Sequence, residues 1–307
     1  MRGAVKYLMY MPKKKFELMK TQTGNYPIGF RYGGSEWQHN LSKLIEWAKA
    51  SGLGVIDFGA DGEQSAQKAV ESGILVGSVD LLDWKNMICL DKDIRADAIA
   101  RNRAYIEACA VSGPINHFLV MLPQDPSLSR LKNFGFMVES FNHLAPVLEA
   151  NQARLVIEGW PGPGALCCTP EGYRAFFKEC PSLAMGINYD ASHLIRMGID
   201  YLRFLQEFGR RVYHVHGKDT EIFTENLYEY GREQEATFAE PTRHGSYSWR
   251  YCIPGHGVNQ WQQILRLLVK NSYKGCISVE LEDSNFFGNT EAEQMGILAG
   301  ARFLASC

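Results

Sequence analysis

Short apolar segments rich in β-branched residues alternate with longer segments of helical periodicity, from Tyr26 almost to the C-terminus. This alternation is the pattern of repeated strand–helix–strand units that build a parallel sheet. Eight segments have strand character: YPIGFRYG, GVIDFGA, ILVGSVDLL, HFLVMLP, RLVIEGW, MGINYD, VYHVHGKD and GCISVELED. Since eight parallel strands separated by helices can close on themselves, the sequence predicts an α/β fold of the (β/α)8 type.

A doubly wound open sheet would give the same alternation, but no GxGxxG turn follows the first strand. The length of 307 residues suits one barrel. We therefore expect a single TIM barrel domain over residues 1–307. Two segments lie outside the repeat: an N-terminal arm of residues 1–25, whose lysine run we expect to be solvated, and a long polar and aromatic insert of residues 220–253 after the seventh strand. The insert is expected to shape a substrate pocket.

Acidic residues and a histidine occupy the ends of the last four strands. They are Glu158, Asp190, His216 and Glu280. A carboxylate that faces a barrel interior is unfavourable unless it is paired, hydrogen-bonded or bound to a cation. Three carboxylates and one imidazole suit a divalent cation that accepts oxygen ligands. The pattern predicts a metal site, with Mn²⁺ as the leading ion and Mg²⁺, Co²⁺ or Zn²⁺ as alternatives.

A buried ion network is the alternative interpretation of these residues, with Arg31, Arg154 and Lys218 as the cations. The gathering of four such residues at one rim of the barrel favours the metal. His193 is open to three interpretations: a core histidine, a partner of a metal ligand or a substrate contact. His214 is interpreted as a packed, hydrogen-bonded histidine.

Several motifs resemble those of the xylose isomerase-like barrel superfamily, in particular its sugar phosphate isomerase/epimerase branch with ketose 3-epimerases and inosose dehydratases. They are VIEGWPG, YDASH, HVHGKDTE, PGHG followed by Trp261, and ISVELED. The resemblance implies that Glu158, Asp190, His216 and Glu280 are the metal ligands and that His193 contacts a substrate hydroxyl. It also implies that Glu158 and Glu280 carry protons to and from the carbon beside a carbonyl, through an enediolate.

Further substrate contacts are expected from residues at the rim. Arg31 and Lys218 could polarise a carbonyl, and Trp160 could stack on the apolar face of a sugar. The expected function is a metal-dependent sugar isomerase or epimerase. The insert is longer than in the small epimerases, and HVHGKDTE resembles the form in family members similar to the barrel subunit of enzymes that cleave C-glycosides through 3-keto glycosides. This resemblance implies the alternative, a lyase or dehydratase that acts on a keto sugar.

Charge and composition argue against several other classes of function. Lys and Arg total 32 against 34 Asp and Glu, so a nucleic-acid partner, and with it a metal-dependent endonuclease, is disfavoured. A non-catalytic sugar-binding subunit is disfavoured because all four candidate ligands are present. The eight cysteines form no CxxC pair, and no apolar run approaches the about 20 residues of a membrane span, so a cytoplasmic protein is expected. The resemblance implies a homo-oligomer, or a hetero-oligomer with a second subunit.

Overall fold

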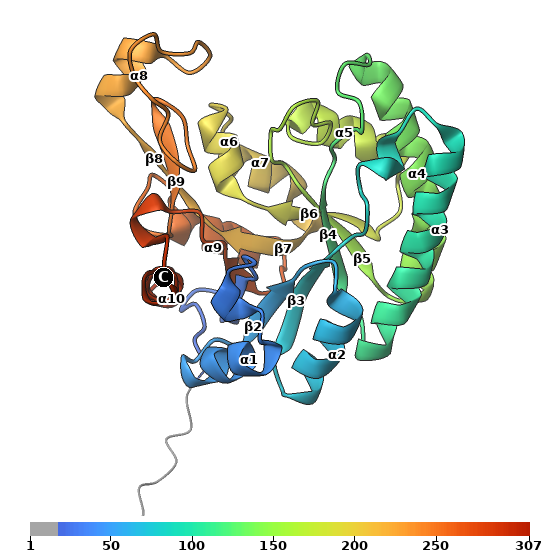
Figure 1. The fold of residues 1–307 in the computed structure, drawn as a ribbon, viewed down its shortest axis with the longest axis horizontal. Coiled ribbons are helices and arrows are strands. Elements are labelled where there is room, and N and C mark those ends of the chain that lie inside the picture. The colour runs from blue at the N-terminus through green and yellow to red at the C-terminus, as the bar shows by residue number, and fades with distance from the viewer. Residues whose placement is uncertain (1–17) are drawn as a thin grey trace, which may run out of the picture.

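The computed structural model describes residues 18–307, in which the eight predicted strands form a closed parallel barrel (Figure 1). Around the barrel the strands follow the order β1-β10-β7-β6-β5-β4-β3-β2. Their bounds are β1 (Ile28–Arg31), β2 (Val55–Phe58), β3 (Leu75–Asp80), β4 (Asn116–Val120), β5 (Arg154–Glu158), β6 (Met185–Tyr189), β7 (Val212–Gly217) and β10 (Ile277–Val279). The predicted (β/α)8 fold is confirmed.

Helices connect the strands and cover the outside of the barrel (Figure 1). They are α1 (Leu41–Ala50), α2 (Gly62–Glu71), α3 (Lys92–Cys109), α4 (Arg130–Ala150), α5 (Pro170–Glu179), α6 (Ala191–Arg196), α7 (Tyr201–Phe208), α9 (Trp261–Lys270) and α10 (Thr290–Ala305). Capping side chains set several starts. Thr169 caps α5 just before Pro170, and Asp200 caps α7 by accepting from the backbone of Arg203.

The main core lies between the outer face of the sheet and these helices. In α9 the apolar residues recur at one-face spacing, and Ile264, Leu265 and Leu268 are fully buried. Each such side chain contributes about 1.5–3 kcal/mol relative to an exposed position. This packing holds the strands in place and so fixes the positions of the side chains at their carboxyl ends.

The insert is folded rather than an irregular loop. It contains β8 (Asp219–Ile222), α8 (Thr224–Tyr230) and β9 (Trp249–Cys252), and β8 pairs with β9 in antiparallel register. This arm, orange in Figure 1, projects from the barrel. The base of the arm joins β7, because β8 begins two residues after the end of that strand. Residues near Trp249 are therefore brought back to the carboxyl ends of the barrel strands.

The predicted N-terminal arm falls partly on residues 1–17, which lie outside the described residues, as does its lysine run. From Leu18 onward the chain is bonded to the barrel: the backbone of Met19 donates to Gly52 and that of Thr23 donates to Cys307. All eight cysteines are free and buried. Within residues 18–307, no helix combines the length and the apolar character needed to cross a membrane.

Candidate metal centre

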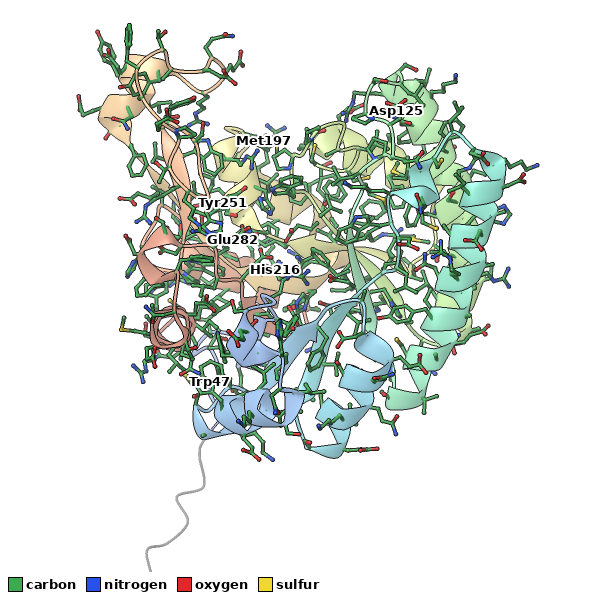
Figure 2. All side chains as sticks on the ribbon, viewed as in Figure 1. Trp47, Asp125, Met197, His216, Tyr251 and Glu282 are labelled. Carbon is green, nitrogen blue, oxygen red and sulfur yellow. The ribbon has the colours of Figure 1, made fainter. Side chains whose placement is uncertain are left out.

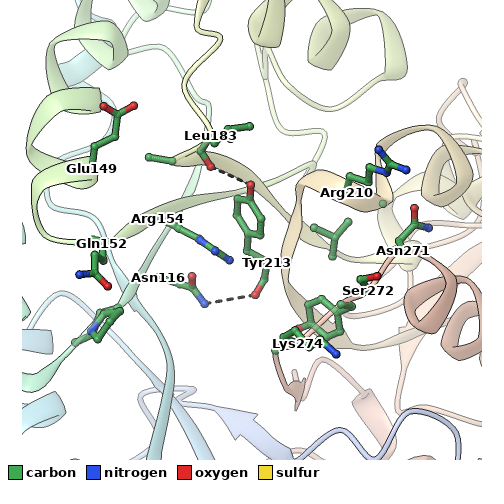
Figure 3. Close-up of a pocket in the computed structure, with 18 residues that line it drawn as sticks. Asn116, Glu149, Gln152, Arg154, Leu183, Arg210, Tyr213, Asn271, Ser272 and Lys274 are labelled. Carbon is green, nitrogen blue, oxygen red and sulfur yellow. Dashed lines mark hydrogen bonds between the residues drawn. The ribbon is translucent and has the colours of Figure 1, made fainter.

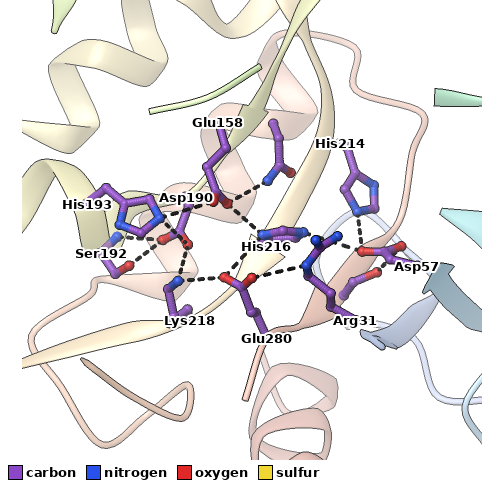
Figure 4. A network of polar contacts seen from close by, with 12 residues as sticks. Arg31, Asp57, Glu158, Asp190, Ser192, His193, His214, His216, Lys218 and Glu280 are labelled. Carbon is purple, nitrogen blue, oxygen red and sulfur yellow. Dashed lines mark hydrogen bonds and ion pairs between the residues drawn. The ribbon is translucent and has the colours of Figure 1, made fainter. Parts of the chain in front are cut away.

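The four predicted ligands converge inside the barrel mouth. Glu158, Asp190, His216 and Glu280 each offer one ligand atom, and these atoms lie within 4.8 Å of one another (Figure 4). Glu158, Asp190 and His216 are buried, and Glu280 is partly buried. Strand ends 122 residues apart in the chain are brought together because parallel strands present their carboxyl ends at one rim.

Local structure aims two of the carboxylates. Asp190 is the N-cap of α6, and its Oδ1 accepts from the backbone N and the Oγ of Ser192, at 2.8 and 2.6 Å. This leaves Oδ2 directed at the cluster. Glu158 is held by Asn188, whose Nδ2 donates to Oε1 at 2.8 Å. Each carboxylate thus keeps at least one oxygen available for a cation.

His216 has a carboxylate facing each ring nitrogen. Its Nδ1 lies 2.7 Å from Glu158 Oε1 and 3.4 Å from Glu280 Oε2, while Nε2 lies 3.4 Å from Asp57 Oδ2. Burial disfavours the charged imidazole, but Glu280 and Glu158 raise its pKa well above the usual value. Without a metal, a charged ring donates from both nitrogens to the carboxylates around it. A divalent cation between Nδ1 and the glutamates would take the place of the proton on Nδ1, so the donor set fits a metal.

Two cations also reach the cluster. Lys218 Nζ lies 2.5 Å from Glu280 Oε2, 2.7 Å from Glu282 Oε2 and 3.2 Å from Asp190 Oδ2. Arg31 Nε lies 3.3 Å from Glu280 Oε1. Burial raises the pKa of Glu280, but Lys218, His216 and Arg31 together hold it well below its usual value. The ion pairs of the alternative interpretation therefore exist for Arg31 and Lys218.

His193 and the insert complete one side of the centre. His193 Nε2 lies 3.3 Å from Glu158 Oε2 and 3.4 Å from Asp190 Oδ2. Its Nδ1 lies 2.7 Å from the hydroxyl of Tyr251, which also accepts from Arg196 at 2.8 Å. Tyr251 belongs to β9, so the arm contributes a side chain to the centre (Figure 2).

An apolar wall faces the polar cluster. The ring of Phe118 stacks on the ring of His216, with the two centroids 5.4 Å apart. The guanidinium group of Arg31 also lies over the Phe118 ring, with its central carbon 4.2 Å from the ring centroid. Phe118 packs with Val120 and Val156, and Trp160 lies against this group. Among residues 18–307, Trp160 makes no polar contact with the ligand cluster, and its place near the mouth of the barrel suits an apolar surface of a ligand.

A cavity of about 320 Å³ adjoins the cluster. Arg31, Glu280, Glu282 and Gln38 line it, together with His244 from the insert. Its size is that of a small-molecule site. The predicted contribution of the insert to a pocket at this rim is consistent with this lining.

A larger cavity, of about 800 Å³, is lined by residues at the amino ends of strands, among them Asn116, Arg154 and Tyr213 (Figure 3). It therefore lies at the end of the barrel opposite the ligand cluster. Arg154 stacks over the Tyr213 ring at 4.0 Å and does not reach the carboxylate cluster, so it was wrongly included in the alternative ion network. Function in TIM barrels is found at the carboxyl end of the strands, and size alone does not make this cavity the site.

Sequence reasoning missed two residues of the centre. Tyr251 gave no signal, because it lies 58 positions from His193 in a segment without recognisable periodicity. Asp57 did give a signal, an acidic residue inside the apolar strand VIDF, and the rule applied to Glu158 would have found it. Asp57, His214 and His216 also place potential ligand atoms within 4.8 Å of one another. His214 is buried and hydrogen-bonded to Asp57, as interpreted from the sequence.

Solved structures share this architecture. The chain is similar to 3-keto-D-glucoside 4-epimerase YcjR from E. coli, with a TM-score of 0.65 at 14% identity over 91% of this chain and 99% of that one. It is similar to D-psicose 3-epimerase, with a TM-score of 0.68 at 15% identity over 90% and 97% of the two chains. The IolI protein with a bound zinc atom gives a TM-score of 0.63 at 16% identity over 90% and 95%. At these identities the likeness shows the fold.

Sequence comparison gives nearer relatives over shorter spans. Inosose dehydratase of Geobacillus thermodenitrificans (strain NG80-2) is 25% identical over 158 residues, which cover 52% of this chain and 50% of that protein. The match thus spans about half the length of that curated relative. A family model described as Xylose isomerase-like TIM barrel matches residues 36–307. This chain belongs to the xylose isomerase-like TIM barrel family.

Proposed function

We propose that this chain is a divalent-metal-dependent sugar isomerase or epimerase that moves a proton on the carbon next to a carbonyl. The observation that carries the proposal is the convergence of Glu158, Asp190, His216 and Glu280 within 4.8 Å beside a cavity of small-molecule size. The names of the similar structures, a 3-keto-glucoside epimerase and a psicose epimerase, support a carbohydrate substrate. The bound zinc of the IolI structure supports a divalent ion, with Mn²⁺ as our first candidate and Zn²⁺, Mg²⁺ or Co²⁺ as alternatives.

The metal would be held by the four residues and would supply electrostatic stabilisation of negative charge on the substrate oxygen. Glu158 and Glu280 are the proposed proton carriers, because both are carboxylates at the centre and both have pKa values held below the usual range. Burial and Glu280 raise the pKa of Glu158, but His216 and His193 lower it by more, so the net shift is downward. A carboxylate that is ionised at neutral pH can accept a proton as a general base.

Neighbouring residues orient the substrate in this proposal. His193 touches both Glu158 and Asp190 and is placed to contact a substrate hydroxyl. Arg31 and Lys218 lie against Glu280 and present positive charge where a carbonyl oxygen would gain negative charge. Trp160 would pack against the apolar face of the sugar.

A lyase or dehydratase that acts on a keto sugar is the second candidate. The 158-residue match to an inosose dehydratase favours it. Both reactions begin with loss of a proton beside a carbonyl, so the same residues would serve. The reactions differ in the next step, which is return of the proton in an epimerase and departure of a substituent in a lyase.

Incubation of the Mn²⁺-loaded protein with ketoses, inososes and 3-keto glycosides in D₂O, followed by mass spectrometry and NMR, tests the proposal. An epimer or isomer with one deuterium supports the isomerase, and an unsaturated or cleaved product supports the lyase. Glu158→Gln and Glu280→Gln variants should both lose exchange while they retain the wild-type circular dichroism spectrum. If no sugar exchanges deuterium, the catalytic proposal is wrong and a sugar-binding role takes its place.

A further inference from the structure

A second polar cluster lies deeper in the barrel, directly behind His216. Its centre is Asp57 of β2, which is fully buried. Asp57 Oδ1 accepts from the Oγ of Ser278 at 2.9 Å, and Oδ2 lies 2.8 Å from His214 Nε2 and 3.4 Å from His216 Nε2. Asp57 therefore touches the back of the ring whose other nitrogen faces Glu158 and Glu280 (Figure 4).

The barrel leaves space for this carboxylate by means of a glycine. A Cβ at Gly77 of β3 would lie 2.0 Å from Asp57 Oδ1 and 2.8 Å from His214 Cε1. Both distances are shorter than real contacts, so any side chain at position 77 would displace Asp57 and His214. The missing side chain at Gly77 thus leaves the space that Asp57 and His214 occupy.

A fully buried carboxylate is a costly way to fill a barrel. Apolar residues of similar volume would stabilise such an interior as well or better. Two anchors, His214 and Ser278, offset the cost and fix the carboxylate in one orientation. Asp57 Oδ2 also faces His216 Nε2 at 3.4 Å, and this ring nitrogen has no hydrogen-bond partner among the described residues.

We propose that Asp57 is a positioning residue that holds the proton of His216 on Nε2 and thereby directs the lone pair of Nδ1 at the candidate metal centre. A carboxylate behind a ligand histidine orients the ring and raises its basicity as a ligand. Asp57 does not itself line the cavity beside Glu280, and its carboxylate contacts His214, His216 and Ser278, so we infer that it acts through His216. This inference rests on the proposed metal centre but concerns a different residue.

Calorimetric titration of the metal-free protein with Mn²⁺ tests it, using Asp57→Asn and Gly77→Ala. Each variant should raise the Kd for Mn²⁺ by about 10–100-fold. Ser78→Ala is the matched control, because Ser78 is the next residue of β3, is fully buried and has no hydrogen-bond partner for its hydroxyl. The control should leave the Kd within twofold of wild type, and Gly77→Ala serves as the test if Asp57→Asn does not fold.

A second readout reports the ring itself. Long-range ¹H–¹⁵N spectra of histidine-labelled protein loaded with diamagnetic Zn²⁺, with His216 assigned by its absence in His216→Gln, should show the proton on Nε2 in wild type and loss of this preference in Asp57→Asn. An unchanged Kd or an unchanged tautomer in the variants overturns the proposal. Binding of two Mn²⁺ ions per chain, with loss of one in Asp57→Asn, also overturns it, since Asp57 would then be a ligand. If wild type binds no Mn²⁺, the proposed function fails, while the tautomer of the metal-free protein, measured above the raised pKa of His216, still decides the role of Asp57.

Discussion

The hydroxyl of Tyr251 lies 2.7 Å from Nδ1 of His193, so a residue of the projecting arm is bonded to a histidine of the candidate metal centre. The Tyr251 ring also lies 4.5 Å below Lys218 Nζ. Because β9 is paired only with β8 in its sheet, the position of Tyr251 depends on the folding of the arm. The arm is therefore part of the site rather than an appendage.

Removal of the Tyr251 hydroxyl should impair turnover without loss of metal. In Tyr251→Phe the ring packing stays, but His193 loses the partner that orients it. We expect kcat/KM for deuterium exchange to fall by about 10–100-fold, the value of a hydrogen bond within a charged site. The Kd for Mn²⁺ should stay within twofold, since Tyr251 is not among the ligand atoms.

The matched control for this prediction is Tyr228→Phe in the same arm, where the side chain is 88% exposed. It should keep wild-type turnover. Equal kinetics for Tyr251→Phe and wild type would show that the contact with His193 has no catalytic role.

Lys218→Met should destabilise the protein when no metal is added. Lys218 neutralises Asp190, Glu280 and Glu282 while almost fully buried, and the variant leaves these carboxylates without that cation. We expect the free energy of unfolding to fall by about 3–5 kcal/mol. Excess Mn²⁺ should restore part of this loss, because a bound ion neutralises the same carboxylates.

Urea unfolding with and without Mn²⁺ measures both effects, with the exposed lysine variant Lys43→Met as control. A fall in stability that Mn²⁺ does not reduce would argue that the carboxylates do not bind the ion.

His117 should make the folded state sensitive to acid. This residue of β4 is fully buried against Tyr105 of α3, neither ring nitrogen has a hydrogen-bond partner, and burial lowers its pKa to about 3. Since the pKa of histidine in the unfolded chain is about 6.5, the unfolded state takes up a proton as pH falls below that value while the folded state does not. The free energy of unfolding therefore falls by about 1.4 kcal/mol for each pH unit below pH 6.5, until His117 is also protonated in the folded state near pH 3.

Comparison of wild type with His117→Leu between pH 7 and pH 4 isolates this contribution, and His143→Leu controls for deletion of an exposed histidine ring. The stability advantage of His117→Leu should grow as pH falls. A constant difference across this range would contradict the assignment.

The sequence alone predicted the barrel and the four candidate ligands at its mouth. Strand periodicity located all eight strands, and the rule that parallel strands end at one rim placed Glu158 near Glu280 although 122 residues separate them. The contact of Tyr251 with His193 depends on how the arm folds back, which no local pattern encodes. The gap at Gly77 for Asp57 likewise depends on packing between neighbouring strands.

The central claim is that Glu158, Asp190, His216 and Glu280 hold one divalent ion. Calorimetric titration with Mn²⁺ of wild type and Asp190→Asn, which keeps the capping oxygen of α6, tests it most directly. We predict one ion per chain in wild type and a Kd raised by more than about 100-fold in Asp190→Asn, since a ligand matters more than the partner of a ligand. Absence of binding in wild type, or equal binding by both proteins, would contradict the claim.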